Sequence, residues 1–180
     1  MKSGADGRVA GAEFIASPNC DQRPPGEAVT LLVLHSISLP AGVYGGEAVE
    51  RLFTNRLDPD AHPSFAALRD LRVSAHFLVR RNGALVQFVP VHLRAWHAGE
   101  SSWRGRVRCN DFSVGVELEG TDDSAFSGPQ YATLTRLTRR LLELLPIRDM
   151  AGHSDVAPHR KTDPGTHFDW MRLMRALAQR

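Results

Sequence analysis

The sequence predicts an α/β fold, in which a central β-sheet is flanked by α-helices and long loops gather at one edge. Two nearly continuous apolar runs, at residues 30–34 and 113–118, predict strands that are buried on both faces. A stripe of Tyr and Leu residues with 3–4 spacing predicts an amphipathic helix over residues 131–145. The length of 180 residues predicts a single domain, with residues 1–28 as a largely irregular N-terminal segment.

The remaining elements follow from local patterns along the chain. Residues 13–16 predict a short strand and residues 47–54 a short helix. Asn82-Gly83 joins two strand-like runs, 73–81 and 85–90, and is the strongest short hairpin signal. Ser127 and Gln130 have the spacing of a capping box at the start of the long helix. Residues 147–151 predict a last strand, and a C-terminal helix is expected to begin at Thr166. Its predicted core face is Phe168, Met171, Met174 and Leu177.

Composition excludes several classes of function. The formal charge is only +2 and no block of Lys or Arg occurs, so nucleic acid is not an expected partner. No window approaches 18 apolar residues, which argues against a membrane span. The first residues have no apolar signal-peptide core, so we expect a cytoplasmic protein, with Cys20 and Cys109 reduced. We also expect a monomer.

The stretch GHSDVAPHRKTDPG, residues 152–165, concentrates the residues that could carry chemistry. Its two prolines and bounding glycines exclude a regular helix or central strand through it. His153 and Asp163 are candidate metal ligands, and Asp155 and His159 are rivals for that role. A catalytic zinc site takes three protein ligands. His35, at the end of the first buried run, is the candidate for the third ligand.

Two further residues suggest a hydrolytic reaction beside the metal. Glu117 interrupts a buried strand, and a carboxylate there is costly unless it is paired or near a metal. It is a candidate base for an attacking water, whereas Glu119 is expected at the solvated end of the strand. Lys161 is a candidate to stabilise an oxyanion. These groups suit the hydrolysis of an amide bond.

Six segments, in order, resemble the AmpD-type 1,6-anhydro-N-acetylmuramyl-L-alanine amidases, within the wider N-acetylmuramoyl-L-alanine amidase group. The resemblance runs from about residue 13 to residue 170. The segments are LHSISLPAGVYGG, LFTNRLDP, RVSAHFLVRRNG, RAWHAG, RCNDFSVGVELEG and GHSDVAPHRKTDPG. The resemblance implies a mixed sheet with packed helices and a zinc-containing groove. It also implies a cytoplasmic amidase of cell-wall recycling that acts on a small muropeptide.

The resemblance also assigns roles to residues of this sequence. It implies that His35, His153 and Asp163 bind Zn²⁺, that Glu117 is the catalytic acid/base, and that Lys161 stabilises the transition state. The substrate-binding residues that it implies, or whose position it marks, are Ser36, Arg72, Trp96, His97, Arg108 and Asn110. Trp96 and His97 are also compatible with plain core packing.

This sequence departs from the family pattern at two positions. Ser36 follows the first metal-site histidine where the family usually has asparagine, and serine is shorter and has no amide donor for a substrate hydrogen bond. His159 stands where the family usually has a small residue. We expect His159 to face solvent. A module that only binds muropeptides and an amidase that acts on intact peptidoglycan are the alternative functions.

Overall fold

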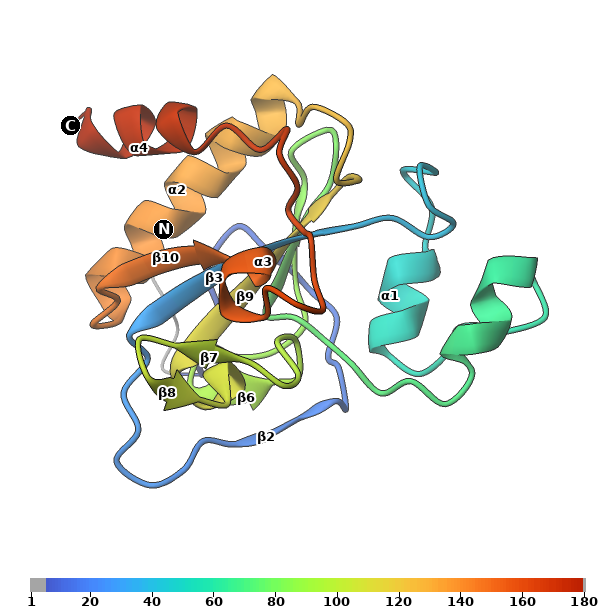
Figure 1. The fold of residues 1–180 in the computed structure, drawn as a ribbon, viewed down its shortest axis with the longest axis horizontal. Helices are drawn as coiled ribbons and strands as arrows, with labels where there is room; N and C mark the ends of the chain where they lie inside the picture. Colours follow the sequence, from blue (N-terminus) through green and yellow to red (C-terminus); the bar gives the residue numbers. More distant parts are fainter. Residues whose placement is uncertain (1–5, 180) are drawn as a thin grey trace.

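The computed structural model describes residues 6–179. Its central element is a mixed sheet of six strands in the order β1-β5-β4-β9-β3-β10 (Figure 1). Only the β4–β5 pair is antiparallel; the other four neighbouring pairs are parallel. The strands are β1 Glu13–Phe14, β3 Leu31–Ile37, β4 Phe77–Val79, β5 Leu85–Gln87, β9 Ser113–Glu119 and β10 Asp149–Gly152. The predicted α/β fold is therefore confirmed.

Two small ribbons and several helices complete the fold. The ribbons pair β2 with β6 and β7 with β8, and the sequence signals did not predict them. Their strands are β2 Cys20–Gln22, β6 Leu93–Ala95, β7 Ser102–Trp103 and β8 Arg106–Val107. The helices are α1 Ala48–Phe53, α2 Gly128–Leu144, α3 His153–Val156 and α4 Trp170–Ala178, with 3₁₀ helices η1 Pro63–Leu68 and η2 Cys109–Phe112.

Alternate residues of the central strands face two different cores. Leu32 and Leu34 of β3 pack with the buried side chains of α2, such as Leu134 and Leu137. Leu31 and Val33 face the other way, into a cluster that includes Val156 of α3. Because side chains alternate along a strand, His35 shares the face of Leu31 and Val33. The predicted first strand is correct, but it continues through His35 to Ile37 instead of ending there.

The long helix α2 begins as predicted. The Ser127 hydroxyl accepts the Gln130 N–H, and the Gln130 side chain accepts the Ser127 N–H, which completes the capping box. Leu141 is buried, whereas Leu142, which the predicted stripe included, is exposed. In Figure 1, α4 lies beside α2 on one side of the sheet, while α1 lies at the other end of the molecule.

The C-terminal helix differs from the prediction in its start and in half of its predicted face, of which Phe168 and Leu177 do pack on the core. It begins after Asp169, whose carboxylate accepts the N–H of Arg172, and not at Thr166. Met171 is 59% exposed and Met174 is also exposed, whereas Leu173 is buried. An every-third pattern slips around a helix of 3.6 residues per turn, so it cannot keep one face on the core.

Glu119 also differs from the prediction, because it is buried and not at a solvated strand end. The predicted hairpin at Asn82-Gly83 is confirmed as β4–β5. The predicted strands at 13–16 and 147–151 correspond to β1 and β10. The N-terminal segment expected to be irregular carries two short strands between residues 6 and 28, and residues 1–5 lie outside the described residues.

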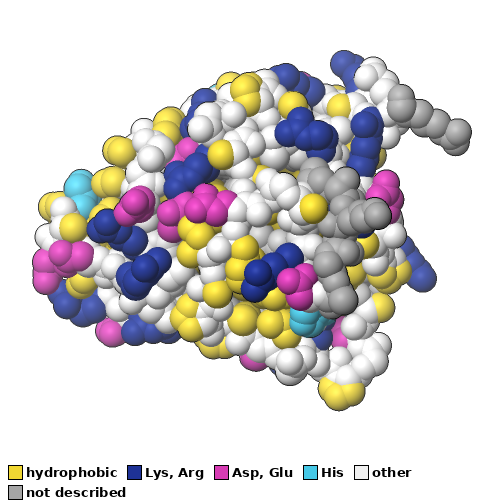
Figure 2. Space-filling model, turned by 180° about the vertical axis from the view of Figure 1, so that it is seen from behind, with side chains coloured by type: hydrophobic (Ala, Val, Ile, Leu, Met, Phe, Trp, Pro, Cys, Tyr) yellow, Lys and Arg dark blue, Asp and Glu magenta, His cyan; other side chains and the backbone are white. Residues whose placement is uncertain are grey.

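The surface agrees with the mild charge of the sequence. On the face that Figure 2 shows, acidic and basic side chains lie interspersed and not in a block of one sign. Among residues 6–179, no helix is both long enough and apolar enough to cross a membrane.

Candidate metal centre

The parallel strands bring the candidate residues to one edge of the sheet. In the β3–β9 register His35 pairs with Glu117, so both side chains leave the sheet on the same face. Gly152, the last residue of β10, pairs with Leu34, and His153 follows directly at the start of α3. Carboxyl ends of parallel strands meet at one edge, which is where α/β folds place their ligands.

Three side-chain atoms converge at this edge from residues far apart in the sequence. His35 Nδ1 lies 2.9 Å from His153 Nδ1 and 3.2 Å from Asp163 Oδ2, and His153 Nδ1 lies 3.1 Å from Asp163 Oδ2. Ligands bonded to a tetrahedral metal ion at 2.0–2.1 Å lie about 3.3 Å apart. Three nitrogen and oxygen donors at this spacing fit a metal ion with its fourth position open.

Burial and charge prepare these groups to bind a cation. Burial lowers the pKa of His35 to about 4, so at neutral pH its imidazole keeps the lone pair that a metal needs. Burial alone would raise the pKa of Asp163, but its hydrogen bonds to His153 and His35 hold it well below the usual range. The site therefore presents two imidazoles and one carboxylate anion.

The loop after β10 reaches the site through one helical turn. The four residues of α3 place His153 at the helix start, although the prolines had led us to expect no regular helix in this stretch. The backbone N–H of Ser154 donates to the carbonyl of Asp163, which ties the two ends of the loop together. Asp155 accepts the Gly152 N–H and His159 is exposed, so neither rival belongs to the three-residue cluster.

Glu117 lies beside this cluster as an unpartnered acid. Its side chain is 8% exposed, and its buried Oε2 has no hydrogen-bond partner among residues 6–179. Burial raises the pKa of Glu117 well above its usual value, and the negative charge of Asp163 raises it further. A carboxyl group of this kind takes up a proton more readily than an ordinary glutamate and can exchange it with a neighbouring group.

Lys161 supplies positive charge at the same place. Burial is the main cause of the shifts at Glu117 and His35, and the Lys161 ammonium lowers the pKa of both groups. Lys161 is half-buried, and its backbone N–H donates to the carbonyl of Ala157. The structure thus brings together all five residues to which the sequence assigned metal binding or catalysis.

Ser36 uses its hydroxyl within the protein. Its Oγ donates to Asp122 Oδ1 at 3.1 Å, and the Thr162 hydroxyl donates to the other Asp122 oxygen. Asp122 therefore links the end of β3 to the loop that carries Lys161 and Asp163. No sequence pattern had indicated Asp122.

The remaining predicted substrate residues are two exposed arginines, Arg72 and Arg108, and a group formed by Trp96, His97 and Asn110. Arg72 is exposed and donates to the backbone carbonyls of Arg69 and Leu71. Arg108 is exposed and borders a cleft of about 510 Å³ that lies next to α3. The cleft is lined by Glu100, Ser101, Ser102, Val107, Arg108, Val156, Ala157, Pro158, His159 and Arg160.

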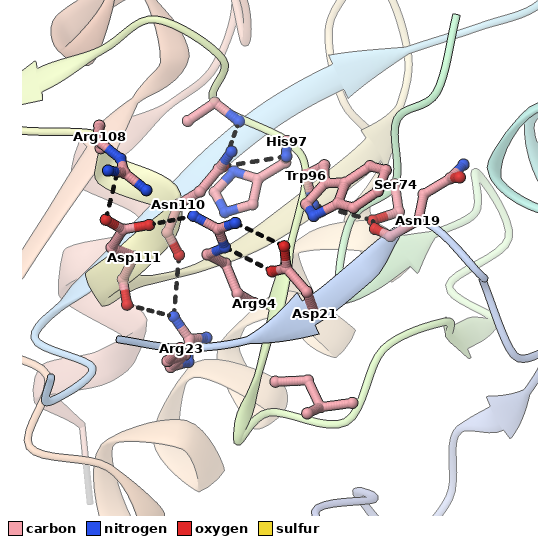
Figure 3. A network of polar contacts seen from close by, with 12 residues as sticks. Asn19, Asp21, Arg23, Ser74, Arg94, Trp96, His97, Arg108, Asn110 and Asp111 are labelled. Atoms are coloured by element: carbon pink, nitrogen blue, oxygen red, sulfur yellow. Dashed lines mark hydrogen bonds and ion pairs between the residues drawn. The ribbon is translucent and has the colours of Figure 1, made fainter. Parts of the chain in front are cut away.

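A polar network connects Arg108 and η2 to the N-terminal segment (Figure 3). Arg94 donates to both Asp21 oxygens and to Asp111 Oδ1, each at 2.6 Å, and Arg108 approaches Asp111 Oδ2 at 3.3 Å. Arg23 donates to backbone carbonyls of the same region. No sequence pattern indicated Arg23 or Arg94, because their partners lie far away in the chain.

Trp96, His97 and Asn110 lie beside this network (Figure 3). The backbone N–H of Trp96 donates to Ser74 Oγ, and the Trp96 side chain is half-buried. His97 is buried behind His35, and Asn110 accepts the N–H of His97. Contact of Trp96 with a substrate stays a prediction, whereas His97 and Asn110 make their contacts within the protein.

Comparisons with known proteins agree with this site. A family profile described as N-acetylmuramoyl-L-alanine amidase matches residues 25–166. The 1,6-anhydro-N-acetylmuramyl-L-alanine amidase AmpD of Escherichia coli (strain K12) is 54% identical over 169 residues, which cover 93% of this chain and 92% of that protein. The AmpD of Citrobacter freundii is 53% identical over 174 residues, with 96% and 92% covered.

Solved structures show the same fold. A crystal structure of a selenomethionine AmpD derivative superposes with a TM-score of 0.94 at 52% identity and covers 96% of this chain and 97% of that chain. The amidase AmiD from E. coli, in complex with the substrate anhydro-N-acetylmuramic acid-L-Ala-D-gamma-Glu-L-Lys, has a TM-score of 0.60 at 31% identity. That match covers 86% of this chain and 60% of the AmiD chain. Since the family profile and the near-full-length relatives agree, the chain belongs to the N-acetylmuramoyl-L-alanine amidase family.

Proposed function

We propose that this chain hydrolyses the amide bond between the lactyl group of 1,6-anhydro-N-acetylmuramic acid and the L-alanine of the stem peptide, in the recycling of peptidoglycan fragments. The observation that carries the proposal is the convergence of His35, His153 and Asp163 beside Glu117. The AmpD relatives, which share more than half of their aligned residues with this chain, are named for that substrate. The AmiD structure holds a muropeptide of the same class.

The metal of the proposed enzyme is zinc, held by His35, His153 and Asp163. Two imidazoles and a carboxylate form one of the donor sets that catalytic zinc takes, and their spacing fits it. When bound, such an ion lowers the pKa of a coordinated water toward about 7 and polarises a carbonyl oxygen. The chain's own residues then need to move protons and to stabilise the charge on the substrate.

Glu117 is the proposed acid/base. It receives the proton of the attacking water and passes it to the nitrogen of the leaving L-alanine. Its raised pKa makes its carboxylate a stronger base than that of an ordinary glutamate, so it takes up the proton of water more readily before passing it on. Positioned proton transfer of this kind accelerates reactions by roughly 10²–10⁴-fold.

Lys161 is the proposed stabiliser of the transition state. Its positive charge lowers the pKa of both Glu117 and His35, which supports a place beside the metal-site residues. From there we expect its ammonium to face the carbonyl oxygen on which negative charge develops. A preorganised donor of this kind contributes about 3–4 kcal/mol to transition-state stabilisation. Its ammonium also favours the ionised form of Glu117, which is the form that accepts a proton.

Substrate polar groups are proposed to meet Arg108 at the cleft and Trp96 at the pocket wall. Arg108 is exposed and its guanidinium matches a peptide carboxylate in shape and charge. Arg72 and Ser36 remain proposed contacts on the strength of the family resemblance. Ser36 would have to share its hydroxyl with Asp122.

Two expectations complete the proposal: the protein acts in the cytoplasm and is a monomer. Cell fractionation tests the first and sedimentation equilibrium tests the second.

The decisive experiment is mass spectrometry of digests of anhydro-muropeptides in H₂¹⁸O, with zinc analysis of the purified protein. We expect free stem peptide, and one ¹⁸O atom on the lactyl carboxylate of the released sugar. An Asp163→Ala variant is the matched control and should lose both zinc and product. A wild-type protein without zinc that only binds the muropeptide would overturn the enzyme in favour of a binding module.

The same digests of intact sacculi test the substrate class. The proposed enzyme should release stem peptide from the anhydro-muropeptides and leave intact sacculi undissolved. Rapid solubilisation of sacculi would contradict the proposed specificity and favour an amidase of intact peptidoglycan.

A further inference from the structure

The two metal-site histidines turn their second ring nitrogens toward the same piece of backbone. His35 Nε2 lies 2.9 Å from His97 Nδ1, and His153 Nε2 lies 3.2 Å from the carbonyl oxygen of Ala98. His97 and Ala98 are consecutive, so one dipeptide contacts both histidines. We call His97–Ala98 the support dipeptide.

Metal binding fixes the direction of these hydrogen bonds. A neutral imidazole that offers Nδ1 to a metal carries its hydrogen on Nε2. His35 Nε2 then donates to His97 Nδ1, and His153 Nε2 donates to the Ala98 carbonyl. His97, as an acceptor at Nδ1, carries its hydrogen on Nε2, which lies 3.1 Å from Ser113 Oγ. Every ring nitrogen of the three histidines is thereby occupied.

The support dipeptide is itself held from two sides. Asn110 Oδ1 accepts the N–H of His97 at 3.1 Å and the N–H of Ala98 at 2.7 Å (Figure 3). Arg160 donates to the Ala98 carbonyl at 2.6 Å and to the Glu100 carbonyl at 2.9 Å. These contacts come from η2 and from the loop after α3, so separate parts of the chain fix one dipeptide.

The sheet also leaves room for the His97 ring. A Cβ atom at Gly115 of β9 would lie 2.5 Å from His97 Cγ, closer than real side chains approach. Any larger residue at Gly115 would push the ring away from His35. His97 is 9% exposed and has no free polar ring atom, so the geometry does not favour a direct contact with substrate.

We propose that the support dipeptide positions both metal-site histidines through their distal ring nitrogens, and that Asn110 positions the dipeptide. His97 is thus a positioning residue and not part of the substrate pocket. Partners of this kind fix the orientation and tautomer of a ligating histidine, and their loss weakens metal binding by roughly 10–100-fold. The inference rests on the metal site of the proposed function.

The test measures Zn²⁺ affinity by competition with a chromophoric chelator. His97→Leu removes the acceptor for His35 and should weaken zinc binding by at least about 10-fold. His97→Asn keeps an oxygen where Nδ1 lies and should stay within about threefold of the wild type. His92→Leu makes the same chemical change at an exposed histidine and should leave the affinity unchanged. Unfolding of each protein in EDTA checks that the fold survives.

Asn110 gives a second and independent test if His97→Leu does not fold. Asn110→Leu removes the acceptor of both backbone N–H groups and should weaken Zn²⁺ binding, whereas Asn110→Asp keeps an acceptor oxygen and should weaken it less. If folded His97→Leu and Asn110→Leu both bind Zn²⁺ as tightly as the wild type, the support role is wrong. A wild type that binds no Zn²⁺ would instead overturn the metal site of the proposed function.

Nitrogen-15 NMR of the histidine rings in the zinc-loaded protein tests the bond directions without any activity. We expect the hydrogen of His97 on Nε2 and its Nδ1 unprotonated, in the wild type and in His92→Leu alike. A hydrogen on His97 Nδ1 would place two donors face to face at His35 and would overturn the proposal.

Discussion

Two buried glutamates of strand β9, Glu117 and Glu119, lie two residues apart and face the same side of the sheet. Glu119 is 4% exposed and fully partnered: Oε1 accepts the Gly45 N–H at 2.6 Å and Oε2 accepts the Arg81 N–H at 2.9 Å. The Arg80 guanidinium lies 3.7 Å from it. Glu117 faces the metal-site edge, and its Oε2 has no such donor in the described part of the chain.

Residue type, strand and burial are the same, so only the surrounding donors differ. Buried polar groups are normally satisfied, because an unpaired one costs free energy. Glu119 joins β9 to the 38–46 loop and to the β4–β5 turn, which is a structural task. Glu117 bears the cost of burial without donors and has a raised pKa, which is what proton transfer requires.

The largest expected effect that tests this contrast is on catalysis. Glu117→Gln keeps the size of the side chain but cannot accept a proton from water, so kcat should fall by roughly 10²–10⁴-fold. The free energy of unfolding should stay the same or rise, because an uncharged amide replaces a buried acid that lacks a partner. Turnover of an anhydro-muropeptide and urea unfolding measure the two quantities.

Zinc content is the control for Glu117→Gln and should equal that of the wild type. A variant that keeps near-normal turnover would show that another group transfers the proton. A variant that loses stability by more than about 2 kcal/mol would show that Glu117 has a structural partner.

The opposite substitution should affect stability and not chemistry. Glu119→Gln places an amide NH₂ against one of the two backbone N–H donors and removes the charge beside Arg80. The free energy of unfolding should fall by about 2 kcal/mol, while kcat of the folded protein stays within about threefold of the wild type. Urea unfolding and turnover below the transition test this. If Glu119→Gln lost turnover without losing stability, Glu119 would be catalytic like Glu117 and not structural.

The sequence could separate these two glutamates only in part. Both interrupt or follow an apolar run, and the run predicted burial for Glu117 correctly. It predicted a solvated Glu119, because the covering groups, the Gly45 loop and Arg81, come from segments 74 and 38 residues away. Burial at a strand end depends on such long-range packing, which no local pattern encodes.

The metal-site cluster shows the same limit. Residue chemistry and motif order pointed to His35, His153 and Asp163, and the structure brings them together. The role of Asn110 was not predictable, because its side chain binds main-chain N–H groups, which any residue possesses. Likewise, the sequence shows Gly115 only as a residue of a buried strand, because the His97 ring that packs against it comes from another segment.

The fold was predictable where periodicity was strong and less so where it was short. The central strands and α2 followed from long apolar patterns. The β2–β6 and β7–β8 ribbons have strands of two or three residues, too short to show a period. Of the face predicted for the C-terminal helix, Phe168 and Leu177 pack on the core, but Met171 and Met174 fitted the same spacing and are exposed.

His76 extends the comparison to a buried base that has both partners, as Glu119 does. Its Nδ1 accepts the Gly115 N–H at 3.0 Å, and its Nε2 lies 3.1 Å from the Leu93 carbonyl. Burial lowers the pKa of His76 to about 3, and the charge of Arg23 lowers it further. Both effects keep the folded imidazole neutral.

This pKa makes the free energy of unfolding depend on pH. Below pH 6.5 the unfolded chain takes up a proton at His76, whereas the folded chain does so only near pH 3. The stabilisation is therefore present above pH 6.5 and is lost as the pH falls through this window. Between pH 6.5 and 5.5, His76→Asn should lose about 1 kcal/mol less than the wild type.

Urea unfolding in EDTA measures this difference, because EDTA removes any contribution from metal release. In the unfolded chain His35 and His97 also take up protons in this range, but both are common to the two proteins. His97, whose ring packs against His76, and the Arg23 guanidinium, which lies 3.2 Å from His76 Nε2, are likewise present in both, so the difference reports on His76. If the free energy of unfolding of the wild type and of His76→Asn changed equally with pH, the proposed low pKa of folded His76 would be wrong.

The smallest expected effect concerns Asp122, a carboxylate whose partners are hydroxyl groups and which is only half-buried. Ser36→Ala removes one hydroxyl donor, but Thr162 remains and water can reach the vacated oxygen. The free energy of unfolding should therefore fall by only about 0.5 kcal/mol, less than for Glu119→Gln. A loss above about 1.5 kcal/mol would mean that the Ser36–Asp122 contact holds the Lys161 loop as firmly as Glu119 holds its neighbours. The greater exposure of Asp122 would then not explain why its contacts stabilise the fold less than those of Glu119.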